Sequence, residues 1–134
     1  MRTLVKDLTT KFGENAGKLW SVLNGRGCLG KDEIIQIANL NENDFNSAVG
    51  WLARENKIFR ENEDRFKLDN TNLVPEIGPN AGRIWKIIEI WNKVDFASIK
   101  RLSDLDDNEI YLALGWLAKE DKIFIDEKSR FSLK

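Results

Sequence analysis

A glycine followed by a tryptophan occurs twice in this sequence, at Gly50-Trp51 and at Gly115-Trp116. Glycine lets another backbone approach closely, and a central tryptophan is a frequent anchor of protein interfaces. Leu112 falls on the same helical face as the second pair. These five residues predict an interface between two protein surfaces. The alternative is that each tryptophan packs beneath the β-hairpin of its own domain.

A second set of residues could contact the phosphates of a nucleic acid: Arg54, Lys93, Lys100, Arg101 and Lys119. Proteins that bind DNA by neutralising phosphates usually carry a clear basic excess. This chain has 21 basic and 22 acidic residues. The overall charge therefore gives no sign of nucleic-acid binding. The simpler interpretation of the basic residues is that they form charge pairs on solvated faces.

Catalytic and metal-binding chemistry has few candidate residues. The chain contains no histidine and one cysteine, Cys28, which removes Cys/His zinc sites, serine–histidine catalysis and intrachain disulfides. We therefore expect no enzyme activity, no cofactor and no small-molecule substrate. The first residues lack the apolar region of a signal peptide, and no run approaches 18 apolar residues. We expect a cytoplasmic protein that does not bind membranes.

The sequence repeats itself after about 65 residues. The motif Gly-x-Asn-Ala-Gly-x-x-Trp begins at Gly13 and again at Gly78, and Ala-x-Gly-Trp-Leu-Ala-x-Glu-x-Lys-Ile begins at Ala48 and at Ala113. About twenty of roughly 57 aligned positions are identical, well above chance. The repeat predicts two domains, residues 1–70 with an N-terminal extension and residues 71–134.

Each copy predicts the same order of elements. An opening helix begins after Gly13 or Gly78, with Pro79 at its first position in the second copy. A short extended segment, a brief second helix and a longer third helix follow, the third capped by Asn41 or Asp106. A β-hairpin ends each copy. The expected hairpin strands are 57–61 with 65–68 and 122–126 with 130–133, and residues 69–77 connect the copies.

Two glycines lie inside the opening helices, Gly17 and Gly82. Glycine in a helix interior costs about 1 kcal/mol relative to alanine. The predicted reason for keeping it is close packing of the helix against a neighbouring element. The alternative is the approach of a ligand.

This order of elements resembles the winged helix-turn-helix domain, and the two repeated motifs are most similar to a small, uncharacterised prokaryotic family of such domains. The resemblance covers nearly the whole chain. It implies an α+β fold, mainly α, of two tandem winged-helix modules, each with three helices, a short strand and a two-stranded wing. Winged-helix proteins commonly bind DNA by placing the third helix in the major groove.

The start of each third helix argues against that use. The carboxylates of Glu42, Asp44, Asp107 and Glu109 would lie near the DNA phosphates, although they also stabilise the helix ends. We therefore favour a non-enzymatic protein-interaction or regulatory adaptor, with the two modules packed as a pseudo-twofold pair through their third helices. Its partner is expected to be another protein. The alternative is a DNA-binding transcriptional regulator.

Overall fold

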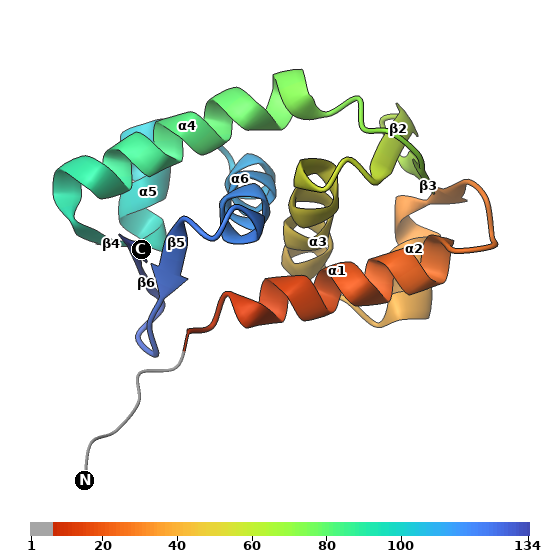
Figure 1. Cartoon of the computed structure of the whole chain (residues 1–134), viewed down its shortest axis with the longest axis horizontal. Coiled ribbons are helices and arrows are strands. Elements are labelled where there is room, and N and C mark those ends of the chain that lie inside the picture. The colour runs from red at the N-terminus through yellow and green to blue at the C-terminus, as the bar shows by residue number, and fades with distance from the viewer. Residues whose placement is uncertain (1–6) are drawn as a thin grey trace, which may run out of the picture.

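The computed structural model describes residues 7–134, which form six helices and two three-stranded antiparallel sheets (Figure 1). The first module contains α1 (Thr10–Leu23), β1 (Leu29–Gly30), α2 (Lys31–Ala38), α3 (Glu42–Arg54), β2 (Ile58–Asn62) and β3 (Arg65–Leu68). The second contains α4 (Val74–Trp91), β4 (Lys93–Asp95), α5 (Phe96–Ser103), α6 (Asp107–Lys119), β5 (Ile123–Ile125) and β6 (Arg130–Leu133). The fold is mainly helical and repeats the winged-helix order twice, so the predicted fold class is confirmed.

Each sheet is built from a wing hairpin and one short strand. The strand orders are β1-β3-β2 and β4-β6-β5, so the last strand of each module lies in the middle. Leu29 lies opposite Phe66, and Val94 lies opposite Phe131. Both phenylalanines are buried. By pairing with the wing, the short strand therefore holds the start of the second helix against the wing and the core.

The third helices begin where their cap residues predict. The side chain of Asn41 accepts a hydrogen bond from the backbone N–H of Asp44, at 2.7 Å. Asp106 accepts the equivalent bond from Glu109 at 2.8 Å, and Glu109 accepts one in return from the backbone N–H of Asp106. These bonds satisfy donors that have no partner inside the helix.

The opening helices begin earlier than the sequence interpretation placed them. α4 begins at Val74, so Pro75 lies in its first turn and Pro79 lies inside the helix. The prediction that Pro79 starts this helix, and that residues 69–77 are all linker, is therefore wrong. The cause is the burial of Leu73 and Ile77, because a helical turn spaced by four residues places both on one apolar face.

The start of each opening helix packs into the other module. Phe12 lies in the core of the second module, whereas Leu73 and Ile77 lie in the core of the first. Leu8 is partly buried against the second core and occupies the position equivalent to Leu73. Figure 1 shows α1 and α4 on opposite sides of the central pair formed by α3 and α6. The two modules thus exchange apolar side chains reciprocally.

Candidate functional site

The third helices of the two modules lie directly against each other. A Cβ atom added to Gly50 would lie 1.9 Å from the backbone oxygen of Leu112, and one added to Gly115 would lie 2.0 Å from that of Ser47. Real Cβ atoms do not approach other atoms so closely. Ser47 and Leu112 occupy equivalent positions of the two copies, so the contact is reciprocal. At both crossing points only glycine fits.

The two tryptophans next to these glycines lie between the modules. Trp51 and Trp116 are half-buried, and each packs against the apolar cores of both modules. The Trp51 ring also lies close to Gly13, where a Cβ atom would be 3.0 Å from it. Leu112 packs against the core of the first module. The structure therefore brings all five predicted interface residues to the contact between α3 and α6.

Two of the predicted phosphate contacts also lie at this contact. The Arg54 guanidinium lies 5.6 Å from the centre of the Trp116 ring, and the Lys119 ammonium lies 5.7 Å from that of Trp51. Arg54 is further paired with Glu120 at 3.0 Å. Cations over aromatic rings are attracted by the electron-rich ring face. Each module thus places a cation on the tryptophan of the other.

The remaining predicted phosphate contacts lie on other elements. Lys93 is in β4 and lies 3.9 Å from Asp126, whereas Lys100 and Arg101 are in α5. Lys100 forms an ion pair with Asp107 at 2.8 Å, and the hydrogen bond to this carboxylate raises the pKa of Lys100. The structure therefore does not gather the five basic residues into one surface, and it supplies carboxylates to four of them.

One polar contact across the interface was missed by sequence reasoning. The side-chain amide of Asn46 donates a hydrogen bond to the side-chain oxygen of Asn108, at 3.0 Å. The two residues are 62 positions apart, and no pattern in the sequence pairs them. The Asn108 side chain therefore contributes a hydrogen bond to the contact between the modules.

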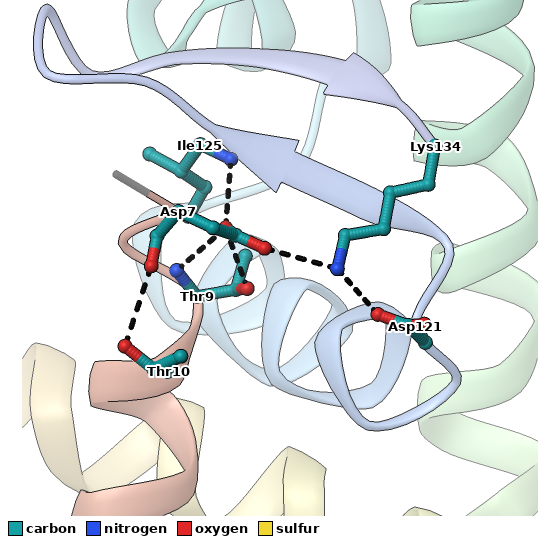
Figure 2. A network of polar contacts seen from close by, with 6 residues as sticks. All are labelled: Asp7, Thr9, Thr10, Asp121, Ile125 and Lys134. Atoms are coloured by element: carbon teal, nitrogen blue, oxygen red, sulfur yellow. Dashed lines mark hydrogen bonds and ion pairs between the residues drawn. The ribbon is translucent and has the colours of Figure 1, made fainter. Parts of the chain in front are cut away.

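A network at the start of the described chain joins the two modules (Figure 2). The Asp7 carboxylate accepts hydrogen bonds from the Thr9 N–H at 3.0 Å and hydroxyl at 2.7 Å, and from the Ile125 N–H at 3.4 Å. Its other oxygen lies 3.0 Å from the Lys134 ammonium. The Leu8 N–H donates to the Ile125 carbonyl oxygen at 3.0 Å. This segment therefore binds the wing of the second module.

The Asp7 network predicts a pH-dependent contribution to stability. Burial raises the pKa of Asp7, but hydrogen bonds from Thr9, Lys134 and Ile125 outweigh burial and hold the pKa below the ordinary value of 3.8. Because the folded-state pKa is the lower one, the contribution is complete above about pH 4 and is lost as the pH falls through the folded-state pKa. We expect Asp7→Asn to lower the free energy of unfolding by about 1 kcal/mol at neutral pH.

Urea denaturation of the wild type and Asp7→Asn between pH 3 and pH 7 measures this effect, and the difference between them should shrink below about pH 4. Asp121→Asn is the matched control, because Asp121 also pairs with Lys134 but its side chain is 77% exposed. Exposed pairs contribute little. A difference that stays constant over this pH range would contradict the assignment to Asp7.

The acidic residues and Cys28 are the remaining candidates for metal binding and for nucleophilic chemistry. Within 7–134, no group of three or more His, Cys, Asp or Glu residues could hold a metal ion. The Cys28 thiol donates a hydrogen bond to Glu61, which raises the pKa of Cys28 and disfavours the nucleophilic thiolate. Over the same residues, none of the helices combines the length and the apolar character needed to cross a bilayer.

Comparisons with known proteins identify the family. A family model described as the winged helix-turn-helix domain (DUF2582) matches the chain twice, at residues 8–68 and 69–133. An uncharacterised protein of Methanocaldococcus jannaschii is 36% identical over 63 residues, which cover 46% of this chain and 90% of that protein. No solved structure matches the chain. The chain therefore belongs to this winged helix-turn-helix domain family and contains two copies of its domain.

Proposed function

We propose that this protein is a non-catalytic regulatory adaptor that binds another protein. Winged helix-turn-helix domains are typically non-enzymatic and serve DNA-binding or regulatory roles. The observation that carries the choice between these roles is the pairing of α3 with α6 through Gly50 and Gly115. A helix that reads DNA must present one free face to the major groove. In this protein the two third helices pack against each other, so part of the surface of each is covered by the other.

Separating the modules to free these helices would expose apolar side chains. Phe12, Leu73 and Ile77 are each buried in the core of the module to which they do not belong in sequence. Exposing large apolar side chains costs about 1.5–3 kcal/mol each. The paired arrangement is therefore the one in which the protein acts.

The charges near the third helices also disfavour DNA. The first turn of α3 carries Glu42 and Asp44, and that of α6 carries Asp107 and Glu109. Lys31 and Lys100 could attract a phosphate, but they form ion pairs with Glu42 and Asp107 instead. Asp44 and Glu109, for which residues 7–134 supply no ion pair, would still repel a phosphate backbone at this surface.

The test is fluorescence anisotropy of labelled random-sequence duplex DNA, titrated with the protein at low and at moderate salt. Non-specific DNA-binding proteins bind with dissociation constants of about 1–100 µM, and their binding weakens steeply with salt. We expect no saturable binding up to about 100 µM protein at either salt concentration.

Micromolar binding that weakens steeply with salt would overturn the proposal in favour of a DNA-binding regulator. The double variant Lys100→Ala/Arg101→Ala then shows whether α5 supplies the phosphate contacts. Lys11→Ala/Lys18→Ala is its matched control, because it removes the same number of cations from the exposed surface of α1.

A further inference from the structure

Two equivalent grooves lie on the surface, each between an opening helix and the end of a third helix. The groove between α1 and α3 has a volume of about 370 Å³, and the groove between α4 and α6 about 320 Å³. The first is lined in part by Gly13, Gly17, Trp20, Trp51, Glu55 and Lys57. The second is lined by the equivalent residues Gly78, Gly82, Trp85, Trp116, Glu120 and Lys122.

The repeat is unusually well preserved in these grooves. Each of the eight residues that line the second groove has an identical residue at the equivalent position of the first. Over the two copies as a whole, only about a third of the aligned positions are identical. The two copies therefore share a constraint that acts on the grooves more strongly than on the rest of the fold.

Packing within the protein does not account for the two glycines inside the opening helices. Apart from its chain neighbours and the backbone of its own helix, a Cβ added to Gly17 or Gly82 would have no atom of residues 7–134 within 4 Å. The close packing that the sequence predicted for these glycines is therefore not found within residues 7–134. Trp20 is 40% exposed beside one of them. An open helix surface kept free of side chains next to an exposed indole is typical of a site that another molecule enters.

A charged cluster joins the two grooves. Arg54, Lys57 and Lys119 lie with Glu55 and Glu120 around a hollow between them. Each carboxylate is shared by two cations: Lys57 and Lys119 lie 3.6 and 3.9 Å from Glu55, whereas Arg54 and Lys122 lie 3.0 and 3.5 Å from Glu120. With Lys122 included, the cluster has four cations against two carboxylates and is positive, although the whole chain carries a formal charge of −1.

We propose that this face binds an acidic segment of a partner protein, with apolar side chains in the twin grooves and carboxylates on the charged cluster. This inference rests on the proposed function as a protein-binding adaptor. The charge of the cluster selects an acidic partner. The volume of each groove accommodates one or two apolar side chains against the indole rings and the bare helix backbone.

A nucleic acid fits this face less well. Single-stranded nucleic acids stack their bases on free aromatic faces. Lys119 and Arg54 already lie over the rings of Trp51 and Trp116. The positive cluster would attract phosphates as it attracts carboxylates, so the distinction rests on the covered indole rings.

The experiment selects a random dodecapeptide display library on the full chain and measures the affinity of a selected peptide by fluorescence anisotropy. We expect the selected peptides to combine acidic with apolar residues. The variant Gly17→Leu/Gly82→Leu fills both grooves from positions where a side chain meets open space. It should bind the peptide about tenfold or more weakly, while its melting temperature is unchanged or higher, because leucine favours the helix.

Two further variants complete the design. Lys57→Glu/Lys122→Glu reverses the charge of the cluster and should weaken binding by about tenfold or more. Lys18→Leu places the same leucine on the exposed surface of α1 outside the groove, and it should bind like the wild type. Full affinity in the groove-filling variant, or a set of selected peptides without acidic residues, would overturn the proposal.

The failure of this inference differs from the failure of the proposed function. A protein that yields no specific peptide and binds no duplex DNA lacks the acidic-segment site but remains compatible with an adaptor that binds elsewhere. Micromolar binding of duplex DNA overturns the adaptor itself. Binding of labelled oligo(dT) that competes with the selected peptide would assign the grooves to single-stranded nucleic acid and overturn the inference.

Discussion

Replacing Gly50 by alanine is expected to lower the free energy of unfolding by about 3 kcal/mol or more. The new Cβ atom would lie 1.9 Å from the backbone oxygen of Leu112 and 2.8 Å from its carbonyl carbon. A change of side-chain rotamer cannot relieve a contact between a Cβ atom and backbone. The two helices must therefore move apart, which disturbs the packing of Trp51 and Trp116 against both cores.

Urea denaturation followed by tryptophan fluorescence measures the loss. Gly17→Ala is the matched control, because it is the same substitution in a helix interior but its Cβ atom meets no other element of residues 7–134 within 4 Å. Alanine favours the helix there, so this control should gain up to about 1 kcal/mol. If Gly50→Ala unfolds at the same urea concentration as the wild type, the close approach of α3 to α6 is wrong.

Gly115→Ala should resemble Gly50→Ala, because it meets the backbone oxygen of Ser47 at 2.0 Å. The double variant should lose less than the sum of the two single losses. Both clashes are relieved by one movement, the separation of the same two helices, and substitutions that share a structural response are not additive.

The elements that the sequence predicts well are those set by local signals. The third helices begin directly after Asn41 and Asp106, because an Asn or Asp at that position accepts a hydrogen bond from the helix it precedes. The starts of the opening helices depend on a contact that is not local. They begin about one turn before the glycine of each repeated motif, because the pairs Leu8/Phe12 and Leu73/Ile77 pack that turn against the other module.

The residues of the candidate site likewise fall into those that the sequence can identify and those that it cannot. Gly50 and Gly115 could be singled out because glycine inside a helix is unfavourable unless something close to it requires the space. The basic residues could not be assigned from the sequence. Each third helix taken alone would leave its cation, Arg54 or Lys119, exposed. Only the pairing of α3 with α6 brings Trp116 and Glu120 to Arg54, and Trp51 and Glu55 to Lys119.

Replacing Phe12 by alanine is expected to lower the free energy of unfolding by about 3–5 kcal/mol. The Phe12 side chain is 9% exposed and lies among buried residues of the second module, including Ile84 and Leu117. Truncation leaves a cavity in that core. Ile77→Ala is the reciprocal variant and should cost about 2–5 kcal/mol by removing a side chain from the first core.

Hydrogen exchange followed by NMR locates each effect. Phe12 belongs by sequence to the first module, yet in Phe12→Ala the amides of α6 and β6 should lose at least as much protection as those of α3 and β3, because the damaged core is theirs. In Ile77→Ala the amides of α3 and β3 should lose at least as much protection as those of α6 and β6. If each variant weakened only the module that contains it in sequence, the exchange of side chains between the modules would be excluded.

The exchange also determines how the protein unfolds. Each core needs side chains from both copies, with Phe12 completing the second and Leu73 and Ile77 completing the first. Neither module can then unfold without exposing apolar surface of the other, so the wild type should unfold in one cooperative transition that fluorescence and circular dichroism report at the same urea concentration. Two separate transitions would mean that the modules are independent domains. If Phe12→Ala also unfolds in a single transition, with the same lowered urea midpoint by fluorescence and by circular dichroism, the tandem pair behaves as one domain.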